Sequence, residues 1–131
     1  TSFELLPTDI GIENDNIKLV HLGDTGYTND FIEINERLGS PDLAFIPIGA
    51  YAPRWIMKES HMNPEEALKT AFDLDAKKSI GMHWGTFILT TEPIEEPKKI
   101  LENLITEEGL GKDFFSTIIP GEVYLFDRKS N

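Results

Sequence analysis

Apolar and polar positions along the chain follow two periods, and the change from one to the other separates strands from helices. Short runs of β-branched and apolar residues that end at glycine or a polar residue are typical of buried strands. Apolar residues that recur at spacings of three and four predict amphipathic helices. The runs that predict strands are 17–22, 42–48 and 78–82, followed by two closing strands at 115–119 and 123–126.

Three helices are predicted between these strands. Residues 29 or 30 to 38 and 95 or 96 to 108 show helical spacing, and a glycine follows each of them. The middle helix runs to about residue 74, with Asn63 as N-cap, Pro64 in the first helical position and Glu66 placed to close a capping box. Strands that alternate with helices indicate an α/β fold with a largely parallel sheet.

Chemically capable residues follow the predicted strands. Asp24 comes after the first strand, Gly49 after the second and His83 after the third. Open α/β sheets bind ligands outside the carboxyl ends of their strands. The sequence therefore predicts a site where these strands end.

Asp24 has two interpretations. Flanked by Gly23 and Gly26, its carboxylate could be exposed at the sheet edge, where it could bind one metal ion or bridge two. The same spacing fits an Asx-turn, in which Asp24 accepts backbone N–H bonds. From spacing alone, the Asx-turn is the favoured interpretation.

The three histidines differ in their surroundings. His83 ends a buried strand, where it could be a zinc ligand or a histidine hydrogen-bonded to backbone. His61 could contact a substrate oxyanion, transfer a proton or pack against the helix that follows it. His21 lies within a strand and is predicted to be a packed or edge histidine rather than a ligand. A catalytic zinc needs about three protein ligands, and Asp24 and His83 supply two.

Composition narrows the function classes. With 131 residues, 40% hydrophobic and 27% charged, the chain has the size and composition of one globular domain. Its net charge of −11 argues against nucleic acid and anionic lipid as partners. Arg54 and Lys58 could still form a local basic patch for a phosphorylated small substrate. No cysteine is present, which excludes disulfides and thiolate zinc sites and fits a cytoplasmic protein.

Five segments together resemble one branch of the metallo-β-lactamase superfamily, the branch that contains N-acylphosphatidylethanolamine-hydrolysing phospholipase D and its bacterial relatives. The resemblance covers about residues 17–126, with the motifs in the family's order. The segments are Gly23–Tyr27, Pro41–Tyr51, Pro53–Trp55, His61–Ala67 and Met82–Phe87.

The resemblance implies an αββα sandwich of two similar halves with two zinc ions at the rim between them. It implies that Asp24 is the metal-bridging carboxylate, that His83 is a terminal ligand, and that His61 contacts the substrate or transition state. The family's His-x-His-x-Asp-His motif belongs to the preceding half. The start at Thr1 has neither a Met nor the features of a signal peptide. We therefore expect residues 1–131 to be a single C-terminal half-domain that begins at a cut end.

For the complete protein, the resemblance implies a zinc-dependent phosphodiesterase that acts on an N-acylphosphatidylethanolamine-like lipid or a related phosphodiester. The isolated chain is expected to be inactive. The alternatives are a lactone or amide hydrolase of the same branch and a non-catalytic half-domain that assembles with itself. A sheet face left without the preceding half could form a homodimer; the residues expected to be exposed there are Leu43, Phe45, Ile80 and Met82.

Overall fold

One mixed sheet organises the described residues (4–5, 11–14 and 16–126) of the computed structural model. Its strands lie side by side in the order in which they occur along the chain. The first two pairings are antiparallel, and the three later pairings are parallel. The strands are β1 (Glu4–Leu5), β2 (Gly11–Glu13), β3 (Lys18–His21), β4 (Leu43–Pro47), β5 (Lys78–Met82) and β6 (Phe115–Ser116).

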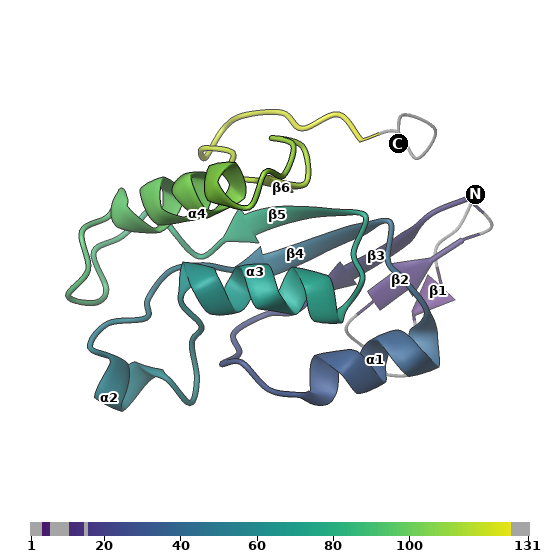
Figure 1. Cartoon of the computed structure of the whole chain (residues 1–131), viewed down its shortest axis with the longest axis horizontal. Coiled ribbons are helices and arrows are strands. Elements are labelled where there is room, and N and C mark those ends of the chain that lie inside the picture. Colours follow the sequence, from purple (N-terminus) through teal and green to yellow (C-terminus); the bar gives the residue numbers. More distant parts are fainter. Residues whose placement is uncertain (1–3, 6–10, 15, 127–131) are drawn as a thin grey trace.

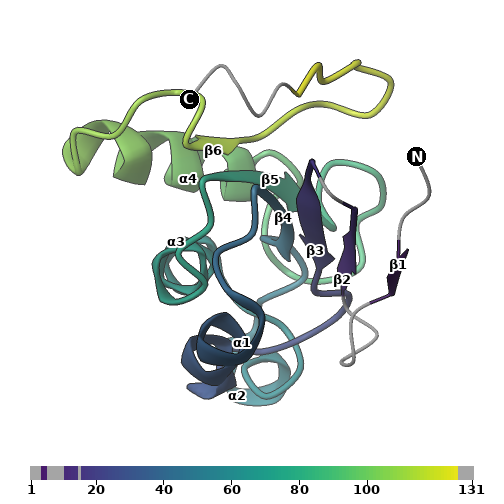
Figure 2. The same ribbon diagram turned by 90° about the vertical axis from the view of Figure 1, so that its right-hand side faces the viewer.

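The three longer helices lie on the same side of this sheet (Figures 1 and 2). Ala44, Ile46 and Ile48 alternate along β4 and its extension, and they join the core that the helices cover. No helix in the described ranges is long and apolar enough to cross a membrane. The helices are α1 (Asp30–Leu38), α2 (Arg54–Met57), α3 (Pro64–Asp73) and α4 (Glu96–Glu107).

The predicted α/β pattern is confirmed. Strands β3, β4 and β5 and helices α1, α3 and α4 fall within a residue or two of their predicted limits. The capping box at α3 forms as expected, because the Asn63 side chain accepts from the Glu66 N–H while the Glu66 carboxylate accepts from the Asn63 N–H. The prediction missed the four-residue α2 and the short strands β1 and β2.

The predicted closing strands are largely wrong. The first is reduced to Phe115–Ser116, and residues 123–126 form no strand. A turn closed by the Glu122 N–H and the Ile119 carbonyl separates the two segments. Val123 and Leu125 are 83% and 89% exposed, so their alternation buries no apolar face that would stabilise a strand.

The sheet face opposite the helices is less exposed than expected. Leu43 and Ile80 are each only 5% exposed, while Phe45 and Met82 are half-buried. Leu43 lies between its in-register neighbours Leu19 and Lys78, which share its face, and Ile80 is flanked on both sides in the same way. Cross-strand neighbours about 5 Å away crowd a side chain from both sides. The expected exposure of Leu43 and Ile80 is therefore wrong.

Candidate functional site

The carboxyl ends of three parallel strands meet at one end of the molecule, the left end in Figure 1. The loops that leave β3, β4 and β5 there carry Asp24, Ala50 and His83. Together with His61, from the segment before α3, these residues line one open cleft of about 450 Å³. The remaining lining residues are Trp84, Thr86, Phe87 and Leu89. The structure therefore brings together the three side chains that the sequence singled out.

Asp24 and His83 are in direct contact. The Asp24 Oδ1 atom lies 2.8 Å from the His83 Nδ1 atom, which donates to it, and the two side chains are 70% and 33% exposed. Even if both groups were charged, a pair so open to water would contribute only about 0–1 kcal/mol to stability. Among the described residues, the Asp24 carboxylate accepts no backbone N–H bond, so the Asx-turn favoured from spacing does not form.

The backbone that presents His83 is held in an uncommon conformation. His83 has φ 60° and Ala50 has φ 63°, a left-handed geometry that costs non-glycine residues roughly 1–3 kcal/mol each. Gly49 lets the two loops pass close to each other here. A Cβ atom on Gly49 would lie 1.9 Å from the His83 carbonyl oxygen, so the backbones that leave β4 and β5 pass in contact. Their hydrogen bond from the Ile48 N–H to the Met82 carbonyl (2.9 Å) fixes that approach.

His61 lines this cleft, and one of its ring nitrogens is buried. Its Nδ1 atom is buried and has no hydrogen-bond partner in the described part of the chain. A buried polar group without a partner costs about 1–3 kcal/mol. The chain beside His61 passes against Gly26, where a Cβ would lie 2.6 Å from the carbonyl oxygens of Lys58 and Glu59. His61 therefore carries a ring nitrogen whose hydrogen-bonding capacity no described residue satisfies.

His21 lies outside the cleft lining, as its position within a strand predicted. Its side chain is exposed, its Nδ1 atom accepts from the Gly23 N–H at 3.2 Å, and its ring lies 5.7 Å from the ring of Phe45. The contacts of His21 are therefore with the loop that follows β3 and with the neighbouring strand β4.

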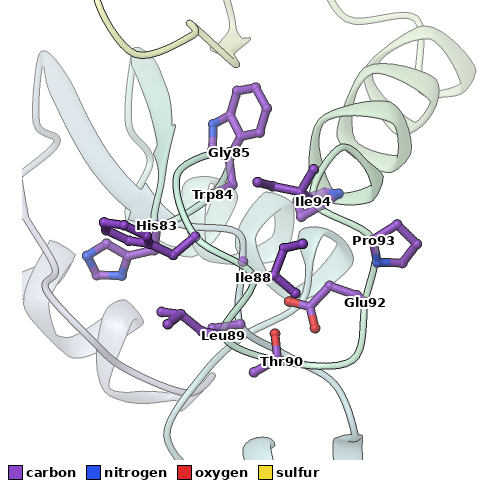
Figure 3. A pocket seen from close by; sticks show the side chains of 13 residues that line it. His83, Trp84, Gly85, Ile88, Leu89, Thr90, Glu92, Pro93 and Ile94 are labelled. Atoms are coloured by element: carbon purple, nitrogen blue, oxygen red, sulfur yellow. The ribbon is translucent and has the colours of Figure 1, made fainter.

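Sequence reasoning missed the apolar rim of the site. Phe87, Ile88 and Leu89 are 74%, 77% and 76% exposed, and Phe87 and Leu89 line the cleft. Figure 3 shows Ile88 and Leu89 on the loop that follows His83, around a second, smaller hollow. Three consecutive apolar residues just after a glycine-containing turn were the signal that could have indicated this rim.

The donors present fit part of a metal site. Two atoms 2.8 Å apart can both lie about 2.0–2.2 Å from one zinc ion, and nitrogen and carboxylate oxygen are both zinc ligands. Within the described residues, however, no group of three or more histidine, cysteine, aspartate or glutamate side chains is placed to hold a metal ion. Asp24 and His83 can thus supply two ligands and need others to complete a site.

A mixed sheet covered by helices on one face, with a carboxylate and a histidine after two strands that flank a third, agrees with the resemblance to one superfamily of metal-dependent hydrolases. The chain belongs to that family: a family model described as a β-lactamase superfamily domain matches residues 9–84. The family and the fold class inferred from the sequence are thereby confirmed.

Individual relatives agree with this assignment. The mitochondrial N-acyl-phosphatidylethanolamine-hydrolyzing phospholipase D of Saccharomyces cerevisiae is 48% identical over 97 residues, which are 72% of this chain and 20% of that protein. A UPF0173 metal-dependent hydrolase of Methanobrevibacter smithii is 32% identical over 113 residues, 86% of this chain and 42% of that protein. Both relatives are therefore more than twice as long as the part that this chain spans.

A solved structure shows the same fold. The isothiocyanate hydrolase from Delia radicum gut bacteria superposes with a TM-score of 0.70 at 19% identity, over 90% of this chain and 43% of that structure. At that identity the match concerns the arrangement of strands and helices.

Proposed function

We propose that this chain is the C-terminal half of a zinc-dependent hydrolase that cleaves a phosphodiester. The observation that carries the proposal is the contact between Asp24 and His83, 2.8 Å apart, in a cleft that His61 also lines. The chain spans only 20–42% of the length of these relatives. This supports a half-domain whose remaining metal ligands come from the preceding part of the protein.

Asp24 and His83 would hold the metal. When bound, zinc lowers the pKa of a water molecule and polarises a phosphoryl oxygen. The exposed carboxylate of Asp24 can reach a second ion as well as the first, because 70% of its side chain is open to solvent. His83 must give up its Nδ1 proton, or bind through Nε2, to act as a ligand.

His61 would contact the substrate. It lines the cleft beside Asp24 and His83, where an imidazole N–H can donate a hydrogen bond to a phosphoryl or leaving-group oxygen. A donor aimed at an oxygen where negative charge develops stabilises the transition state, and losing one such donor typically costs about 100- to 1000-fold in rate.

The apolar rim supports a lipid-like substrate. Trp84, Phe87 and Leu89 line the same cleft as the two histidines, so an apolar chain attached to the phosphodiester can be withdrawn from water there. Each buried methylene contributes about 0.8 kcal/mol. The substrate we propose is an N-acylphosphatidylethanolamine-like phosphodiester, in line with what the name of the yeast relative says of that protein.

The test uses the complete protein and the isolated chain side by side. With added zinc, the complete protein should hydrolyse a long-chain phosphodiester, and Asp24→Asn should lower kcat about 100-fold or more. Asp30→Asn, at an exposed aspartate in the first turn of α1, is the matched control and should keep full activity. Faster turnover of a lactone or an amide would refute the phosphodiester assignment. Zinc-dependent turnover by the isolated chain, abolished by Asp24→Asn, would refute the half-site.

A further inference from the structure

The segment that carries His61 is buried at Tyr51 and Met62, which are 6% and 0% exposed, but at no residue between them. Between β4 and α3 the only helix is the four-residue α2, and none of its residues is buried. Trp55 and Ile56, its largest apolar side chains, are 85% and 54% exposed. Hydrophobic burial therefore holds the two ends of the segment, and polar contacts add to it in setting the position of His61.

Arg54 supplies the central polar contact. Its half-buried guanidinium donates from Nη1 to the carbonyl oxygen of His61 (3.1 Å) and to that of Tyr51 (3.4 Å). From Nη2 it donates to the carboxylate of Glu66. One rigid fork thus joins the beginning of the segment, its end and helix α3. The planar arrangement of donors in arginine suits this bridging, which a lysine ammonium on a flexible stem does not reproduce.

Glu66 ties this fork to the core. The Oε1 atom that Arg54 contacts also accepts from the Asn63 N–H at 3.1 Å, and the Asn63 side chain accepts in return from the Glu66 N–H at 2.9 Å. Glu66 belongs to α3, whose neighbouring residues Ala67 and Leu68 are buried in the core. The chain of contacts therefore runs from a packed helix through Glu66 and Arg54 to the backbone of His61.

The start of the segment is held from the opposite side. The Glu92 carboxylate accepts from the N–H groups of Tyr51 (3.0 Å) and Ala52 (3.2 Å), and the Tyr51 hydroxyl donates to Glu96 at 2.5 Å. Burial raises the pKa of Tyr51 well above its usual range, with Glu96 acting in the same direction, so the phenol stays a donor. Glu92 lies on the loop that follows His83, and its side chain points back into that loop (Figure 3).

We propose that Arg54 is a positioning residue whose guanidinium, braced by Glu66, holds the His61 carbonyl and thereby keeps the His61 imidazole in the cleft. The position of the His61 imidazole can be measured on the isolated chain, whatever reaction the protein catalyses. Only its consequence for turnover rests on the function proposed above. Because the Nδ1 atom of His61 has no hydrogen-bond partner among the described residues, no bond from that atom would hold the ring once the Arg54 fork is lost.

Long-range ¹H–¹⁵N NMR of the imidazoles in the isolated chain tests the placement. Arg54→Met and Arg54→Lys should both shift or broaden the His61 ring signals and leave those of His21 in place. Lys77→Met is the matched control, because it also removes a cation from a partly buried ion pair, with Asp42 at 3.0 Å, at the other end of β5. Unchanged His61 signals in a folded Arg54 variant, or equal changes in Lys77→Met, would overturn the proposal.

A second variant covers the case in which Arg54→Met does not fold. Glu66→Gln retains a side chain that can close the capping box but removes the charge that braces Arg54, so it should move the His61 signals in the same direction. If those signals stay as in the unchanged chain, the bracing role of Glu66 is wrong.

Kinetics of the complete protein separate the two proposals. Arg54→Lys should lower kcat by up to about 100-fold, as a displacement of about 1 Å can, while bound zinc and KM stay nearly constant. If the His61 signals move but kcat does not, the positioning by Arg54 stands and the assigned role of His61 in hydrolysis is refuted.

Discussion

Gly49→Ala tests the contact that places His83. The substitution adds one methyl group at a position where the added Cβ would lie 1.9 Å from the His83 carbonyl oxygen, 3.0 Å from its carbonyl carbon and 3.3 Å from the Cα atom of Trp84. All three neighbours are backbone atoms, so no side chain can rotate away. Real Cβ contacts essentially never fall below 3.0 Å, which means that the two backbones must separate by at least 1.1 Å.

The cost follows from what resists this separation. One residue earlier, the Ile48 N–H donates to the Met82 carbonyl at 2.9 Å. This hydrogen bond follows the five in-register residue pairs that join β4 and β5. Overpacking costs about 1–3 kcal/mol, and the loss of this hydrogen bond adds about 1 kcal/mol. We expect the free energy of unfolding to fall by about 3 kcal/mol. The Asp24–His83 contact would lengthen from 2.8 Å to as much as 3.9 Å, beyond hydrogen-bonding distance.

Urea unfolding followed by fluorescence and the imidazole NMR signals of His83 measure the two effects. Gly111→Ala is the control, because a Cβ there meets no heavy atom within 4 Å and its φ is not positive. It should change the unfolding free energy by no more than about 0.5 kcal/mol. A Gly49→Ala protein that loses less than about 1 kcal/mol and keeps its His83 signals would show that the close approach does not set the site.

Four further outcomes are expected. Asp24→Asn should change stability by less than about 1 kcal/mol in urea, because the pair it breaks is exposed; a larger loss would make Asp24 a structural residue. Asn63→Ala should cost about 1 kcal/mol in thermal unfolding and Asn63→Gly only a few tenths, and equal losses would exclude a capping effect. Burial raises the pKa of Glu92, but hydrogen bonds from Thr90 and from backbone N–H groups outweigh it, so the net pKa is lowered. The stabilisation by Glu92 is therefore complete above its unfolded-state pKa and lost as the pH falls through the folded one. Glu92→Gln should accordingly destabilise the chain more at about pH 6 than at about pH 3 in urea titrations, and an equal effect at both would contradict this sign. A homodimer through the sheet face opposite the helices stays a prediction, and light scattering that shows only a 14.8 kDa species would refute it.

Local patterns predicted the elements whose formation is decided locally. The β4 and β5 runs are buried between other strands, so their continuous apolar character identified them. The Asn63 capping box is read from residues three apart and forms as expected. Asp24 and His83 could be brought together in advance, because the carboxyl ends of parallel strands share one sheet edge.

What the sequence could not provide depends on partners far along the chain. The alternation at Val123 and Leu125 indicates which side chains share a face, but not whether a neighbouring strand or core exists to bury them. The approach of Gly49 to His83 is a distance between segments 34 residues apart, and the left-handed turn at Ala50 lies directly beside it. The hydrogen bonds of Arg54 to two carbonyl groups and of Glu92 to two N–H groups likewise involve main-chain atoms, which every residue carries and no motif reveals.

The strand order of the sheet bears on how the chain is built. Within the described ranges, β1 to β6 lie in the sheet in the order in which a ribosome makes them. Each new strand therefore has its docking edge ready when it emerges, and none has to be inserted between two strands that have already paired. Each strand pairs with the strand that directly precedes it along the chain, so no pairing has to wait for a segment made later. Growth by addition at one open edge lets this sheet assemble during synthesis, with β6 the last of these strands to pair.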